Sequence, residues 1–169
     1  PENVYSLTKS EMAQKVYGNV WVIDRESVKY YDGDGNEIDG DYIFYSGTGE
    51  MEAFKLEDGT LASYSEYCPR FWDKIEIEAV YREDDGCVYP PESSAVPVMR
   101  IESVNPERLM MSRHFGRITE YKPDGSKEIN PSAYARYECR IATPDEKAFY
   151  EGLLLRNTDE WYEKLTGNK

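Results

Sequence analysis

The sequence predicts a mainly β fold, in which an antiparallel sheet closes or folds onto itself between a short leading helix and trailing helices. Segments 74–79 and 135–141 alternate apolar and polar residues, which is the period of a strand with one buried and one exposed face. Many such segments follow one another, separated by turn residues. Helix-capping patterns stand before the first strand and after the last one.

Length and charge limit the class of protein. A chain of 169 residues with 40% hydrophobic residues predicts one domain, residues 1–169, with a sizeable core. The net charge of −13 argues against nucleic acids and anionic membrane surfaces as partners. The apolar runs are too short to span a bilayer, so we expect no transmembrane segment.

The first elements begin at a capping box. Thr8 is the expected N-cap and Glu11 its partner. A short helix is expected to follow, with Met12 and Val16 one turn apart, and to end at Gly18. A long strand is then expected over residues 20–31, with Trp21 and Ile23 on one side.

Further strands are predicted wherever alternation lies between turn signals. In the strand at 74–81, Ile75 and Ile77 are expected to face the core, while Glu76 and Glu78 face solvent. Residues 82–97, rich in Gly and Pro, are expected to form a long irregular loop. The other expected strands are 42–45, 51–56, 61–67, 99–104, 108–114, 117–122 and 134–141.

The pattern switches to helix after residue 142. Thr143, Pro144 and Glu146 combine an N-cap, a proline in the first turn and a capping-box acid. A second helix is expected after Thr158, and it carries Trp161 and Tyr162. Residues 143–169 are therefore expected to form a helical extension to a barrel at residues 7–142.

This order of elements resembles the lipocalin-like, or calycin-type, small barrels, most of all the bacterial lipocalin-like domains of secreted and envelope proteins. The resemblance implies an up-and-down barrel of about eight strands, a possible internal cavity and an extracytoplasmic location. It also implies that an arginine of the last strand, Arg136 or Arg140, covers Trp21. The segments that carry the resemblance are 18–21, 33–36, 44–49, 109–111 and 137–140.

Aromatic residues are the best candidates for a binding site. Inside a barrel they would line an apolar cavity with hydroxyl groups, which suits a small amphipathic ligand. On a surface they could stack on sugar rings, and in a filled barrel they would simply form the core. The candidate ligand-binding residues are Trp21, Tyr42, Phe44, Tyr64, Trp72 and Arg136.

The sequence offers few metal or catalytic constellations. Asp32, Asp34 and Asn36 have the first ligand spacings of a calcium loop, but the same residues are typical of a polar hairpin turn. His114 is the single histidine, and no nucleophile motif accompanies it. We expect neither catalysis nor a cofactor.

The sequence contains three cysteines. Cys139 shares the apolar side of its strand and is expected to be a buried free thiol. Cys68 and Cys87 either pair in an oxidising compartment or are unrelated thiols.

Together these features predict a non-catalytic, extracytoplasmic module that binds a small hydrophobic or amphipathic molecule in a barrel cavity. The alternative is a protein-interaction or structural domain with a filled core and no small-molecule ligand. In that case the contact surface would be the helical extension with Trp161 and Tyr162, or an exposed aromatic patch.

Overall fold

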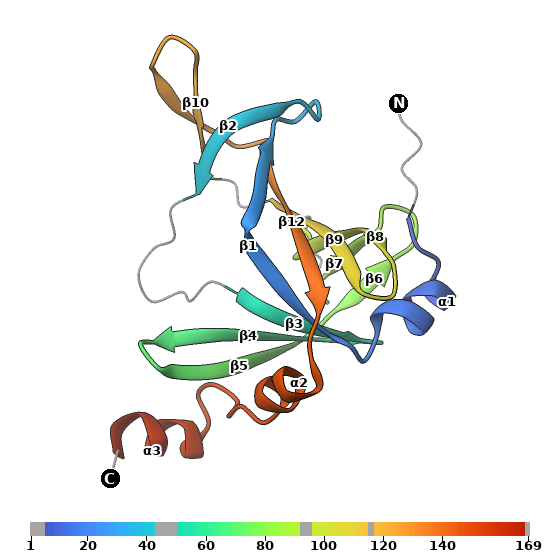
Figure 1. Cartoon of the computed structure of the whole chain (residues 1–169), viewed down its shortest axis with the longest axis vertical. Helices are drawn as coiled ribbons and strands as arrows, with labels where there is room; N and C mark the ends of the chain where they lie inside the picture. Colours follow the sequence, from blue (N-terminus) through green and yellow to red (C-terminus); the bar gives the residue numbers. More distant parts are fainter. Residues whose placement is uncertain (1–5, 43–50, 92–95, 115–116, 168–169) are drawn as a thin grey trace.

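The computed structural model describes residues 6–42, 51–91, 96–114 and 117–167. It is an antiparallel, nearly closed β-barrel with a short helix before it and two helices after it (Figure 1). The predicted fold class is therefore confirmed, although twelve strands of the described ranges join the sheet where about eight were expected.

Short turns connect most of the neighbouring strands and helices along the chain. The helices are α1 (Lys9–Glu11), η1 (Met12–Val16), α2 (Pro144–Glu151) and α3 (Asp159–Gly167). The strands are β1 (Val20–Tyr31), β2 (Glu37–Tyr42), β3 (Met51–Glu57), β4 (Thr60–Cys68), β5 (Phe71–Glu78), β6 (Val80–Arg82), β7 (Cys87–Tyr89), β8 (Met99–Val104), β9 (Arg108–His114), β10 (Ile118–Tyr121), β11 (Lys127–Asn130) and β12 (Tyr134–Ile141).

Nine strands form the barrel wall, in the order β5-β4-β3-β1-β12-β9-β8-β7-β6. Strands β5 and β6 are the two ends of this order, so the ring of described strands stays open between them. The chain itself bridges this seam at Ala79, whose backbone N–H donates to the Gly59 carbonyl at 2.9 Å.

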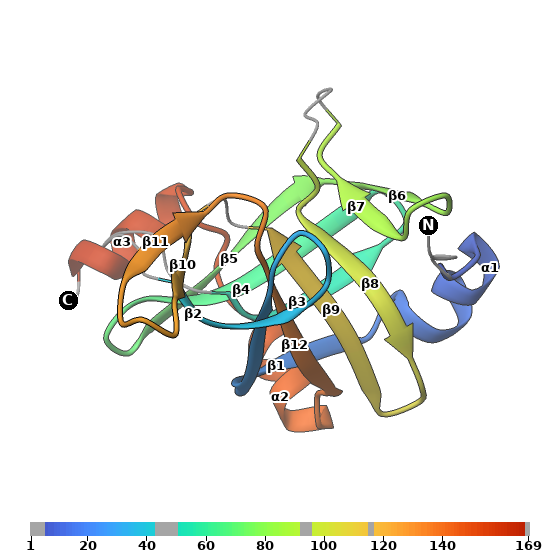
Figure 2. The ribbon, with the colours of Figure 1, turned by 90° about the horizontal axis from the view of Figure 1, so that it is seen from above.

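The remaining strands, β2, β10 and β11, form an arm that continues from the second half of β1. Figure 2 shows that the arm and the N-terminal helix lie at opposite ends of the molecule. Strand β11 was not predicted, and β7 lies inside the stretch expected to be a loop. Both are short, with four and three residues, so neither offers a long alternating pattern.

Gly40 allows the arm to approach β1 closely. A Cβ atom at this position would lie 3.0 Å from Tyr30 Cβ and 3.2 Å from the Thr119 carbonyl oxygen. We expect Gly40→Ala to lower the free energy of unfolding by about 1–3 kcal/mol, the usual cost of overpacking. Urea denaturation measures this, with Gly167→Ala, where a Cβ meets nothing within 4 Å, as the control. Equal stability of the two variants would contradict the close packing.

Apolar side chains from every wall strand except β5 pack in the barrel interior. Met12 and Val16 of η1 join this core and are fully buried. Trp21 is also fully buried, and its Nε1 donates to the Val16 carbonyl at 3.2 Å. The core includes Trp21, Phe54, Leu56, Leu61, Met99, Ile101, Leu109, Met111, Tyr137 and Cys139.

One burial prediction is wrong, although the strand presents the predicted face to the core. Ile75 and Ile77 were expected in the core, but each is 37% exposed. Their register partners on β4 are Ser63 and Leu61, and Leu61 does face the core. Because β5 ends the strand order at the seam, no barrel strand beyond it covers these two side chains. Glu76 and Glu78 are exposed, as predicted.

Candidate functional site

The structure separates the residues that the sequence grouped around one cavity. Trp21 lies in the barrel core, while Tyr64 and Trp72 pack against α2 in a second apolar cluster. Phe44 lies outside the described residues, and only the backbone of Tyr42 is described, in β2.

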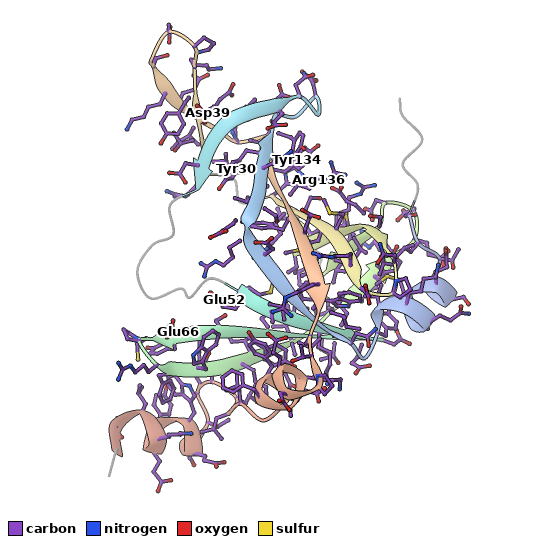
Figure 3. All side chains as sticks on the ribbon, viewed as in Figure 1. Tyr30, Asp39, Glu52, Glu66, Tyr134 and Arg136 are labelled. Carbon is purple, nitrogen blue, oxygen red and sulfur yellow. The ribbon has the colours of Figure 1, made fainter. Side chains whose placement is uncertain are left out.

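Arg136 belongs to neither of these two apolar clusters. Its Nε lies 2.7 Å from Glu102 Oε1, and its guanidinium carbon lies 5.8 Å from the centre of the Tyr31 ring. Figure 3 shows Arg136 on β12, well separated from the helices that follow this strand. Arg140, the other arginine considered for covering Trp21, binds Glu146 instead.

Strand β4 carries apolar residues on both faces, which explains the position of Tyr64. Leu61 faces the barrel core, whereas Ala62 and Tyr64 belong to the outer cluster with Val20 and Tyr150. The rings of Tyr64 and Tyr150 lie 5.2 Å apart, and burial raises the pKa of Tyr64 to about 12. Helix α2 therefore acts as a second layer over the outside of the barrel.

Helix α2 begins as the sequence predicts. Thr143 is the N-cap, its hydroxyl accepts from the Glu146 backbone N–H, and the Glu146 side chain accepts from the Thr143 N–H. Arg140 at the end of β12 binds both carboxylate oxygens of Glu146 at 2.7 Å. The capping box and the ion pair thus join α2 to the barrel wall.

This arrangement makes the anchoring of α2 sensitive to acid. The hydrogen bonds from Arg140, and then that from Thr143, lower the pKa of Glu146 to about 2. A lowered folded-state pKa gives stability that is full above about pH 4.5 and is lost as the pH falls toward 2. We therefore expect the stability difference between the native chain and Glu146→Gln to shrink over this range in unfolding experiments. The exposed carboxylate of Glu138, changed to Gln, is the control. A difference that is independent of pH would contradict the assignment.

The tail, residues 144–167, is fastened to β5 by a buried ion pair. Asp73 is fully buried and accepts from Arg156 Nε at 2.6 Å, Arg156 Nη2 at 2.9 Å and Trp161 Nε1 at 2.9 Å. Lys74 also exchanges backbone hydrogen bonds with Leu154 and Arg156, so the tail runs beside β5 like a short extra strand. This group could not be predicted from the sequence, because its members are up to 88 residues apart.

The buried Trp161 also packs the tail against β4 and β5. Only 2% of Trp161 is exposed, and its ring lies edge-on to Tyr67 at 5.1 Å and to Phe71 at 5.7 Å. Trp161 therefore belongs to the fold, and it is Tyr162, 50% exposed, that faces solvent.

A cleft of about 880 Å³ lies between β5 and the tail. Trp72 is half-buried at its wall, held edge-to-face by Phe149 at 5.8 Å and Tyr150 at 6.1 Å. The tail helices that bound it lie below the β4–β5 hairpin in Figure 1. The lining residues are Trp72, Gly152, Leu153, Leu154, Glu160, Glu163, Lys164, Thr166 and Gly167.

A second pocket, of about 200 Å³, lies at the seam below the N-terminal helix. It is lined by Tyr17, Asp58, Val80 and Tyr81, among others. Its volume is below the usual range for small-molecule sites, whereas the cleft beside Trp72 lies within it.

The predicted calcium loop is the turn between β1 and β2. Asp32 Oδ1 accepts from the backbone N–H groups of Asp34 and Asn36, both at 2.9 Å, as in a polar hairpin turn. Within the described ranges, no group of three or more His, Cys, Asp or Glu side chains could hold a metal ion.

The cysteines are free thiols. Cys139 is buried as predicted, and burial raises the pKa of its thiol to about 12. Cys87 is buried and Cys68 half-buried, and the structure does not pair them. Burial lowers the pKa of His114, whose ring lies 5.3 Å from that of Tyr134.

None of the helices in the described part of the chain is long and apolar enough to span a membrane. The antiparallel, nearly closed barrel is compatible with a lipocalin-like fold. Comparison with protein-family models, curated proteins and solved structures found no match.

Proposed function

We propose that this protein is a non-catalytic binding module that holds a small amphipathic ligand in the cleft beside Trp72. The observation that carries the proposal is the contrast between a barrel core filled by side chains and an open cleft on the outside of the same sheet. Lipocalin-like kinship and an extracytoplasmic location are part of the proposal, and both rest on the resemblance in sequence.

The composition of the cleft supports this proposal. Trp72, Leu153 and Leu154 supply apolar surface, and α3 supplies polar and charged side chains on the facing wall. Polar surface exceeds apolar surface in this lining, which suits an amphipathic ligand better than a purely hydrophobic one. Helix α2 and the Asp73–Arg156 pair hold the two walls together, so the cleft exists before a ligand arrives.

Binding of a neutral environment-sensitive dye tests the proposal. We expect saturable binding of one dye molecule per chain, and we expect Trp72→Ala to weaken it at least tenfold. Ile129→Ala removes another large exposed side chain, 59% exposed on the arm, and should leave binding unchanged. Absence of saturable binding, or equal effects of both variants, would overturn the proposal.

A protein-interaction role is the second candidate. The tail exposes Phe149 by 49%, Leu155 by 36% and Tyr162 by 50%, an unusual concentration of exposed apolar side chains in one short segment. This alternative predicts that no neutral dye is taken up in the cleft and that Tyr162→Ser and Phe149→Ser reduce self-association in sedimentation experiments.

A further inference from the structure

We propose that the ligand of the Trp72 cleft is a neutral saccharide, which lays one ring face on the Trp72 indole and directs its hydroxyls toward α3. This inference rests on the proposed function and names its ligand class. Three features of the cleft carry it: the signs of its charges, its supply of hydrogen-bonding groups and the placement of its aromatic wall.

The charges of the cleft have both signs on one helix. Glu160, Glu163 and Lys164 are spaced i, i+3 and i+4 along α3, so they share one side of the helix, and all three line the cleft. An anionic ligand would meet two carboxylates, and a cationic ligand would meet the ammonium group. A ligand without net charge avoids both repulsions.

The same side chains supply complementary hydrogen-bonding groups. The carboxylates of Glu160 and Glu163 only accept and the Lys164 ammonium only donates. The Thr166 hydroxyl already donates to the Tyr162 carbonyl at 2.8 Å, so toward a ligand it accepts. A sugar hydroxyl donates one hydrogen bond and accepts others, so a row of hydroxyls can satisfy all four groups at once. Hydrogen bonds to charged groups are the stronger kind, which favours a polyhydroxylated ligand over a purely apolar one.

The Trp72 indole suits the apolar face of a sugar ring. Phe149 and Tyr150 both meet the Trp72 indole edge-to-face, so the plane of the indole is fixed by the packing of α2. The C–H groups on one face of a pyranose ring form a flat apolar surface that packs on such a ring. With Trp72 on the sheet and the polar groups on α3, the two walls match the two sides of a sugar.

The net charge of −13 favours a different ligand class, a cationic one, because it attracts cations to the whole surface. Glu160, Glu163 and Lys164 are exposed, and the two carboxylates outnumber the ammonium group, so the charges of the cleft do not exclude a cationic ligand. Comparison of a cationic ligand with neutral sugars therefore decides between the two.

The test compares matched ligands by isothermal titration and by displacement of the neutral dye. The panel contains neutral mono- and oligosaccharides, an amino sugar, a uronic acid and an alkyltrimethylammonium salt. We expect a neutral saccharide to bind and to displace the dye, with affinity reduced about tenfold or more by Glu163→Gln and by Trp72→Ala. Glu138→Gln on β12 is the matched control and should bind like the native chain.

The outcomes separate this inference from the proposed function. If the dye binds in a Trp72-dependent way but no neutral saccharide displaces it, the saccharide inference is overturned and the binding module stands. Tighter binding of the alkylammonium salt than of every neutral sugar also overturns the inference. If neither dye nor saccharide binds, the proposed function fails as well.

Discussion

Asp73→Asn is expected to lower the free energy of unfolding by about 3–5 kcal/mol, because it leaves the Arg156 guanidinium charged and buried without its counter-ion. Asp73 is fully buried, and the Arg156 side chain is 16% exposed. The same change weakens the acceptor of the Trp161 indole N–H. All three contacts that it disturbs lie between β5 and the tail, so the loss should be concentrated there.

Urea denaturation and hydrogen exchange measure this prediction together. We expect the amides of residues 153–161 to lose protection while those of β9 and β12 keep theirs. Asp84→Asn, an exposed position in the turn before β7, is the control and should be nearly neutral. If Asp73→Asn cost no more than this control, the ion pair would not be what fastens the tail.

A double variant tests whether Asp73 and Arg156 stabilise the fold as a pair. Replacing a buried ion pair by apolar residues is often close to neutral, although removing one partner is costly. We therefore expect Asp73→Leu combined with Arg156→Met to be more stable than Asp73→Asn alone. Additive losses in the two positions would show that the side chains do not interact.

Trp21→Ala is the second large effect that we expect, a loss of about 3–5 kcal/mol, because it empties the largest side-chain volume of the barrel core. It also leaves the Val16 carbonyl without the indole donor, which loosens η1 over the end of the barrel. Trp21→Phe should lose less, because it retains most of the apolar surface.

The measurement is again the urea midpoint, combined with dye binding under conditions where the variant is folded. We expect folded Trp21→Ala to bind the dye as the native chain does, because Trp21 and the cleft belong to different clusters. A stable variant that has lost dye binding would instead place the ligand inside the barrel.

Local signals in the sequence predicted most elements of the barrel. Strands β1, β8, β9 and β12 have the predicted bounds, because long alternation and clear turns define them within a few neighbouring residues. The two capping boxes were likewise visible, since all their partners lie within four positions.

The site could not be predicted to the same degree, for two physical reasons. Alternation shows that β4 has two faces but not that α2 covers the outer one, so Tyr64 and Trp72 were placed inside the barrel. The Asp73–Arg156 contact joins residues 83 positions apart, and no local pattern of charge predicts such a pair. The exposure of Ile75 and Ile77 follows from the open seam, which is a property of the whole sheet.

The indole N–H signals of the three tryptophans test the central claim most directly, because Trp21 lies in the barrel core, Trp161 in the tail attachment and Trp72 in the cleft. The signals are assigned with single Trp→Phe variants, and the spectrum is recorded as the neutral dye is added. We expect the Trp72 signal to shift and saturate while that of Trp21 stays in place. A saturating shift of Trp21 with Trp72 unmoved would show that the ligand enters the barrel and not the cleft.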